Sequence, residues 1–364
     1  MASRNSVLHQ GLGRRFIVAA PVEASEEALY QVTDDYLSLQ VGGIMVGVGG
    51  RHPLLERAGC IDGELVRRYT DYLHRRDPEV LVAVDAEGGS IFNLLQGQSP
   101  LGSGRSYVVA GDRRRYQEHL TRHAELLVYL GVNMNFAPLL DVARRGYCGY
   151  PAEDHRAFSD NPEEVADFAE LFSRVMLDHG IIPVVKHYPG YGALSANPHQ
   201  TLTSYPKDDE ERSLEPYRRL VKAGVPAVMT GHVLTSKDAQ WPASLSCRHE
   251  DSLRADLGFP GVTIADELFM GAITEAMETA GMGADPRGEH RAVQALRAND
   301  MLIVSYPVQN RDGTLRGRPG GQRRFPDMYA AARSALSTGV LDSRRHRESL
   351  MRITALWNRR GRGQ

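Results

Sequence analysis

The chain has 364 residues, of which 42% are hydrophobic and 24% are charged, and its formal net charge is −2. This composition is typical of a globular protein with a large core, and the balanced charge argues against a dedicated nucleic-acid binder. No run approaches the roughly 20 apolar residues of a membrane span, and the 3 cysteines lack a disulfide or metal-ligand spacing, so we expect a cytoplasmic protein without nucleic-acid or membrane partners.

Short apolar runs alternate with amphipathic segments along the chain, which is typical of a parallel α/β fold. In chain order the predicted strands are 16–19, 43–46, 80–84, 133–136, 183–186, 227–230, 262–265 and 301–304. Helical patterns lie near 25–39, 61–75, 113–130, 162–179, 208–223, 248–256, 287–298 and 323–338, with a last helix near 343–358. Eight such units predict a (β/α)8 TIM barrel rather than an open dinucleotide-binding sheet, since no Gly-x-Gly-x-x-Gly follows the first strand. We expect a single domain over 1–364, with the barrel at about 12–340.

Polar side chains follow the ends of most predicted strands. They are Asp85, Asp141, Lys186, His187, His232, Asp266 and Glu267. In a barrel the carboxyl ends of the strands meet on one rim, which is where this fold places its active sites. The segment 305–322, rich in Gly, Pro and Arg, is predicted to be a long loop on the same rim or a surface insertion.

Several longer motifs occur in a fixed order. They are Asp85-Ala86-Glu87-Gly88-Gly89, Gly131 to Val142, Arg156-Ala157-Phe158, Lys186-His187-Tyr188-Pro189-Gly190 and Met229-Thr230-Gly231-His232-Val233. Together they resemble the bacterial β-N-acetylhexosaminidases of glycoside hydrolase family 3, in their single-barrel form. The resemblance covers nearly the whole chain and implies a retaining β-glycosidase that acts on a small glycoside, favouring an N-acetylglucosaminide or another amino sugar.

The resemblance also implies roles for individual residues. Asp266 matches the nucleophile, which forms a covalent glycosyl–enzyme intermediate, and His199 matches the acid/base on the loop after the fifth strand. The positions that bind sugar hydroxyls are matched by Asp85, Arg156, Lys186 and His187. No cofactor or metal is implied, and we expect a monomer or a homodimer.

The chain departs from the family in the segment that carries the acid/base. The family's Gly-His-Gly-Asp is replaced by Gly190-Tyr191-Gly192-Ala193, and Asn197 stands where an aspartate orients the histidine. Ser90 and Asn93 stand where the family places arginines. An amide cannot neutralise an imidazolium, and Asp→Asn beside the working histidine of the serine-protease triad costs roughly 10⁴ in kcat. These departures predict an activated leaving group, an altered sugar or acceptor, or weakened catalysis. Gly190 and Gly192 are expected to let the loop swing over the substrate.

Other interpretations stay open. Asp266 could instead cap a helix that starts near Leu268, Glu267 is expected to point away from the barrel axis, and His232 is expected to be structural. A histidine acid/base would leave room for phosphate, which permits phosphorolysis or transglycosylation. The chain could also be a non-catalytic sugar binder, or a Schiff-base lyase in which Arg156 and neighbouring cations lower the pKa of Lys186. A metal-dependent hydrolase is disfavoured, because neither His-x-His nor His-Glu-x-x-His is present.

Overall fold

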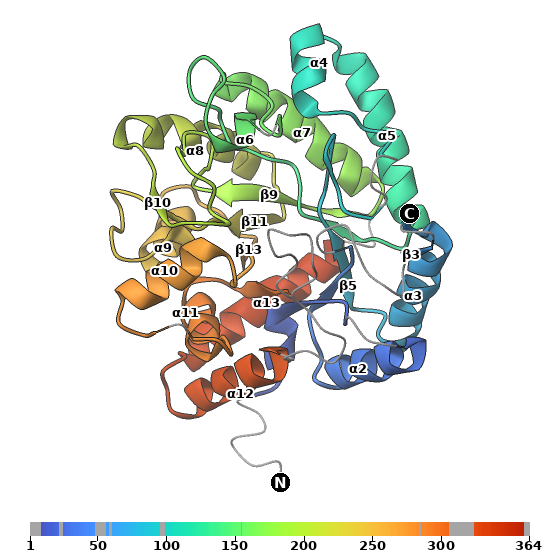
Figure 1. The fold of residues 1–364 in the computed structure, drawn as a ribbon, viewed down its shortest axis with the longest axis vertical. Helices are drawn as coiled ribbons and strands as arrows, with labels where there is room; N and C mark the ends of the chain where they lie inside the picture. The colour runs from blue at the N-terminus through green and yellow to red at the C-terminus, as the bar shows by residue number, and fades with distance from the viewer. Residues whose placement is uncertain are drawn as a thin grey trace.

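The computed structural model describes residues 9–21, 25–47, 56–57, 60–94, 99–153, 155–283, 285–305 and 324–359. Eight parallel strands close into a barrel in the order β1-β14-β13-β11-β9-β8-β5-β2. Helices surround the strands (Figure 1), so the predicted TIM barrel is confirmed.

The barrel strands lie where the apolar runs predict them. Their bounds are β1 Phe16–Ala19, β2 Gly43–Met45, β5 Leu81–Val84, β8 Met134–Asn135, β9 Ile182–Tyr188, β11 Ala227–Thr230, β13 Val262–Ala265 and β14 Met301–Val304. Strand β9 is the longest and all of its residues are buried. The register between β9 and β11 shifts beside Lys186 and His187, because Val228 pairs with Val185 and Thr230 with Tyr188. Three two-stranded sheets flank the barrel: β3 Glu56–Arg57 with β4 Cys60–Ile61, β6 Ala86–Gly88 with β7 Ile91–Phe92, and β10 Thr203–Ser204 with β12 Val233–Leu234.

The long helices also lie close to their predicted positions. They are α2 Glu26–Ser38, α3 Gly63–Arg76, α5 Arg113–Tyr129, α7 Pro162–Asp178, α8 Lys207–Lys222, α9 Cys247–Ala255, α11 Glu289–Ala298, α12 Arg324–Ser337 and α13 Ser343–Arg359. Side-chain caps fix several of their starts. For example, Asp62 accepts from the backbone N–H groups of Glu64 and Leu65, and Asn161 accepts from that of Glu163.

Five further helices in the described part of the chain lie outside the predicted helical ranges. They are η1 Leu12–Arg15, α4 Gly104–Ala110, α6 Tyr150–Glu153, η3 Ala243–Leu245 and α10 Gly271–Thr279. Helix α10 follows the strand that ends before Asp266, so it adjoins the rim of the barrel.

Apolar side chains from all eight barrel strands fill the barrel interior. Ile17, Phe136 and Ile264 belong to this cluster, and Ile353 and Leu356 from α13 pack against it. Helix α13 therefore lies across the end of the barrel where β1 and β14 begin (Figure 1), opposite the rim that carries the polar residues. Most of the predicted loop 305–322 lies outside the described residues. Among the helices that the described ranges contain, none is long and apolar enough to cross a membrane.

Candidate active site

Lys186 lies near the carboxyl end of β9 and is almost completely buried, with 3% of its surface exposed. Its Nζ donates to Asp85 Oδ1 at 2.7 Å and lies 2.8 Å from Glu87 Oε1. Burial alone would lower the pKa of this ammonium, but the charges of Asp85 and Glu87 outweigh burial and raise the pKa above its ordinary value. The expectation that neighbouring cations lower the pKa of Lys186 is therefore wrong, because two carboxylates contact the amine.

Glu87 joins Lys186 to Arg156. The Arg156 guanidinium binds it through two bonds, from Nε to Oε2 at 3.0 Å and from Nη2 to Oε1 at 2.8 Å. Burial favours the neutral acid, but Arg156 and then Lys186 outweigh it and lower the pKa of Glu87 to about 2. The ion pair that Arg156 makes is thus buried rather than at the surface, and its Nη1 donates to the Tyr150 hydroxyl at 3.1 Å.

Glu87 was not assigned a role from the sequence. The signal that could have identified it is its place in the Asp85-to-Gly89 motif, two residues after Asp85, where the hairpin of β6 and β7 begins. Two carboxylates and two cations meet here from segments about 100 positions apart in the chain: Asp85 and Lys186 are separated by 101 residues.

His187 lies between two aspartates. The buried carboxylate of Asp141 is 2.8 Å from His187 Nδ1, and it also accepts from the backbone N–H of Tyr191 at 2.7 Å. Because an ionised carboxylate only accepts, Nδ1 carries the proton, which fixes the orientation of the ring. The other ring nitrogen, Nε2, faces Asp266 with 4.0 Å between it and Oδ2.

Asp266 follows β13, and its side chain is 15% exposed at the rim. Its backbone N–H donates to the carbonyl of Thr230 at 3.1 Å, and its Oδ1 accepts from the backbone N–H of Glu267 at 2.8 Å. Burial opposes its ionisation, but His232, His187, the Glu267 N–H and Lys186 together lower the pKa of Asp266 below its ordinary value. The rim therefore presents an ionised carboxylate.

The helix-cap interpretation of Asp266 is wrong. The next helix, α10, begins at Gly271 rather than near Leu268, and its N-cap residue is Met270. The Asp266 carboxylate bonds its immediate neighbour and leaves Oδ2 turned toward His187 and Tyr191.

Tyr191 occupies the position where the family pattern has a histidine. Its ring stacks on His187 with 4.3 Å between centroids, and its hydroxyl is 3.5 Å from Asp266 Oδ2. The same hydroxyl accepts from the backbone N–H of His232. Gly231 makes room for the ring, because a Cβ there would lie 2.6 Å from a Tyr191 ring carbon. Tyr191 thus packs His187 from one side and approaches the rim carboxylate.

The side chains of His232 and Glu267 bond to groups other than the Asp266 carboxylate. The His232 ring contacts Ser244 Oγ and the Glu267 carbonyl, both at 2.7 Å, which fits the expected structural role. The Glu267 carboxylate accepts from the backbone N–H of Ser305 at the end of β14, 3.4 Å away. Burial raises the pKa of Glu267 to about 7.

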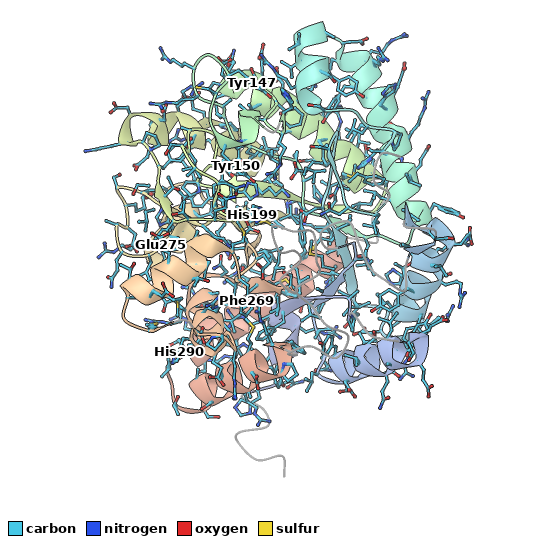
Figure 2. All side chains as sticks on the ribbon, viewed as in Figure 1. Tyr147, Tyr150, His199, Phe269, Glu275 and His290 are labelled. Atoms are coloured by element: carbon cyan, nitrogen blue, oxygen red, sulfur yellow. The ribbon has the colours of Figure 1, made fainter. Side chains whose placement is uncertain are left out.

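His199 lies on the loop after β9 and is exposed (Figure 2). Desolvation by surrounding atoms lowers the pKa of its imidazole. The charge of Asp266 raises this pKa, and the charge of Arg156 lowers it. The Asn197 side chain accepts from the backbone N–H of His199 at 2.9 Å. Asn197 therefore supports the loop backbone and not the imidazole ring.

The first part of this loop is packed against the barrel. Tyr191, Gly192, Ala193 and Leu194 are buried, and the Gly192 carbonyl accepts from the N–H of Arg144 at 3.1 Å. A Cβ on Gly192 would lie 1.8 Å from the Val142 carbonyl oxygen. Close packing of two backbones, and not freedom to swing, accounts for this glycine.

An open cavity of about 250 Å³ adjoins the charged cluster. Its lining includes Glu87 and Arg156 together with Ser90, Ser103 and His155. Ser90 is one of the two positions where the family pattern has an arginine, so a small side chain borders open space beside the cluster.

Comparison with known proteins gives a consistent result. The family model described as the N-terminal domain of glycosyl hydrolase family 3 matches residues 22–356. A β-hexosaminidase of Alkalilimnicola ehrlichii is 33% identical over 258 residues, which cover 67% of this chain and 70% of that protein. A β-hexosaminidase of Thioalkalivibrio sulfidiphilus is 33% identical over 263 residues, which cover 68% of this chain and 71% of that protein.

Solved structures extend the comparison to nearly the whole chain. A family 3 β-N-acetylglucosaminidase from Paenibacillus sp. superposes with a TM-score of 0.75 and 29% identity, covering 97% of this chain and 62% of that one. A β-N-acetylhexosaminidase from Beutenbergia cavernae superposes with a TM-score of 0.74, and the match covers 96% of this chain and 98% of that one. At 24% identity the second structure shows the shared fold.

Proposed function

The chain belongs to glycoside hydrolase family 3, and from that premise we propose that it is a retaining β-N-acetylhexosaminidase with Asp266 as nucleophile and His199 as acid/base. Its substrate would be a small N-acetylglucosaminide or a related amino-sugar glycoside. The observation that carries the proposal is the position of the Asp266 carboxylate at the rim, where its Oδ2 lies 4.0 Å from His187 Nε2.

The proposed reaction has two steps. In the first, an Asp266 oxygen forms a bond to the anomeric carbon while the bond to the leaving oxygen breaks, and His199 gives that oxygen a proton. In the second, His199 takes a proton from water, the water oxygen attacks the anomeric carbon, and the Asp266 carboxylate is released. The lowered pKa of Asp266 supports the first step, because the nucleophile must be ionised.

The charged cluster would bind the sugar beside Asp266. Asp85 is 23% exposed, and the buried Lys186 holds one of its carboxylate oxygens, which leaves the other for a sugar hydroxyl. The buried ion pairs of Glu87 would keep the cationic side chains of Arg156 and Lys186 in fixed positions. Hydrogen bonds between charged side chains and a neutral sugar are strong where water is excluded.

Covalent trapping tests the nucleophile. A ring-fluorinated glycosyl fluoride of N-acetylglucosamine should label the protein, and peptide mapping should place the label on Asp266. Asp266→Asn should abolish labelling, whereas Glu267→Gln should retain it, because the Glu267 side chain is directed toward Ser305. A label on any residue other than Asp266, or labelling that survives Asp266→Asn, would contradict the proposal.

A screen of aryl glycosides, run with and without phosphate, tests the substrate and the mode of transfer. Hydrolysis predicts release of the free sugar at a rate independent of phosphate, whereas phosphorolysis predicts a sugar phosphate. The screen also separates turnover from simple sugar binding. Borohydride reduction with substrate present should leave Lys186 unmodified, since the raised pKa keeps the amine protonated and disfavours a Schiff base.

A further inference from the structure

Helix α10 carries the loop on which His199 lies. The backbone N–H of Gly271 donates to the carbonyl of His199 at 3.0 Å, and that of Ala272 donates to the carbonyl of Pro198 at 3.1 Å. The first N–H groups of a helix have no partner within it, and Met270, the N-cap residue, supplies no side-chain bond. The histidine loop itself therefore caps α10.

A carboxylate on α10 holds the next part of the same loop. Glu275 Oε2 accepts from Thr201 Oγ1 and from the backbone N–H of Leu202, each at 2.8 Å. These two bonds favour the ionised form and lower the pKa of Glu275. Figure 2 shows Glu275 on α10 and His199 nearer the middle of the barrel face. Helix and loop are thus joined by four hydrogen bonds over residues 198–202.

The contact between α10 and the loop is so close that residue 271 has to be a glycine. A Cβ at Gly271 would lie 2.3 Å from the carbonyl oxygen of Gln200 and 2.6 Å from its carbonyl carbon. Both atoms belong to backbone, so the loop would have to shift to admit any larger residue.

We propose that α10 positions the acid/base, with Glu275 as the positioning residue that fixes the His199 loop relative to Asp266. This inference rests on the proposed role of His199. Asn197 bonds only the loop backbone, so the site of His199 depends on how the loop docks. Because α10 and Asp266 both follow β13, docking on α10 ties the acid/base to the element that carries the nucleophile.

Leaving-group dependence distinguishes positioning of an acid from a general structural role. Dinitrophenolate leaves the sugar without being protonated, whereas the phenolate of a phenyl glycoside needs a proton from the acid. Loss of docking should therefore lower kcat/KM for phenyl N-acetyl-β-glucosaminide by about 10-fold or more, a fraction of what a general acid contributes. For the dinitrophenyl analogue kcat/KM should stay close to that of the wild type. A structural defect would lower both rates together.

Glu275→Ala and Gly271→Ala perturb the contact from the same helix in different ways, and both should show this selective loss. Glu278→Ala is the matched control, since Glu278 is exposed on the same helix and makes no side-chain hydrogen bond or ion pair among the described residues. Thr201→Val combined with Glu275→Ala should lower the rate no further than Glu275→Ala alone, because Glu275→Ala already removes the bond from Thr201.

His199→Ala separates the two proposals. If it lowers the rates on both glycosides equally, the proposed acid/base role fails. The positioning role is overturned if His199→Ala lowers kcat/KM for the phenyl glycoside alone, while Glu275→Ala and Gly271→Ala keep the same kcat/KM values as the control Glu278→Ala. Amide exchange needs no turnover: Glu275→Ala should speed exchange at Leu202, and an unchanged rate there would also overturn docking through Glu275.

Discussion

Glu87 shows how one residue can control several others at this site. It binds Arg156 through two hydrogen bonds and also contacts Lys186, and its side chain is only 7% exposed. Both cations are expected to bind sugar, so Glu87 is expected to affect activity without contacting the anomeric carbon.

Glu87→Gln should destabilise the protein. The pKa of Glu87 falls from 4.5 to about 2 on folding, which corresponds to a contribution of about 3 kcal/mol at neutral pH. This contribution is present above pH 4.5 and is lost as the pH falls toward 2. Urea unfolding at pH 7 should therefore show a free energy of unfolding lower by about 3 kcal/mol, and a smaller difference at pH 3. Glu26→Gln, at an exposed pair with Arg68, should cost less than about 1 kcal/mol. Equal losses at pH 7 and pH 3 would contradict this assignment.

The surroundings of His199 set the pH range of the proposed acid. The lowered pKa of His199 predicts that kcat/KM for a phenyl glycoside declines as pH rises through a value below 6.5. The charges of Asp266 and Asp85 raise the pKa of the imidazole, and the charges of Arg156 and His187 lower it.

Asn197→Asp adds a negative charge two residues from His199, so it should raise the pKa of the imidazole and move the basic limb of the profile to higher pH. The isosteric change Asn161→Asp, at the cap of α7, should leave the limb in place. The measurement is kcat/KM for the phenyl glycoside between pH 4 and 9. A basic limb at the same pH in Asn197→Asp would show that another group donates the proton.

At the scale of the element, the loop after β9 combines two kinds of contact. Its buried stem packs on the loop after β8 through Gly192 and Val142, and its outer part docks on α10. A helix after Asp266 was expected only under the helix-cap alternative, with a start near Leu268. Helix α10 instead starts at Gly271, where no side chain caps it and a loop more than 70 positions earlier supplies the acceptors. Capping residues in the sequence predict the start of a helix only where the cap comes from residues next to that start.

Gly192→Ala should lower both stability and activity. The added Cβ would meet the Val142 carbonyl at 1.8 Å, and relieving such overpacking typically costs about 1–3 kcal/mol. Val142 follows Asp141, which holds His187, so kcat/KM should fall as well. Gly63→Ala is the matched control, because its Cβ would meet only a Leu130 methyl at 3.5 Å at the start of a helix. Thermal unfolding and kcat/KM check both variants, and a Gly192→Ala enzyme as stable as Gly63→Ala would contradict close packing.

At the scale of the whole molecule, the two ends of the barrel differ in character. The carboxyl-end rim carries the proposed chemistry. The opposite end is closed by α13, whose Arg352 donates to Asp300 at 2.8 Å. Asp300 precedes β14, is buried, and also accepts from Arg254 at 2.8 Å. In TIM barrels this end serves stability. The single-domain organisation over 1–364, the cytoplasmic location and the monomeric or dimeric state stay predictions.

Asp300→Asn should therefore reduce stability without changing catalysis. Burial opposes ionisation of Asp300, but Arg352 and Arg254 outweigh it and lower the pKa of this carboxyl. Removing one partner of a buried ion pair typically costs about 3–5 kcal/mol, so urea unfolding should show a loss of that order while kcat stays near the wild-type value. Asp256→Asn, at an exposed pair with Lys237, should leave stability almost unchanged, because solvent screens such a pair. A large fall in kcat for folded Asp300→Asn would contradict the division between the two ends.

The order of strands and helices follows from the sequence alone, because apolar runs and amphipathic periods are local properties of the chain. The sequence also predicts that Asp85, Lys186, His187 and Asp266 meet on one rim, since parallel strands bring their carboxyl ends together. The pairing of the charges could be learned only from the folded chain. Arg156 binds Glu87 across 69 positions, and Glu275 binds the histidine loop across 74. Such contacts depend on closure of the barrel and on the packing of its loops, which no local pattern encodes.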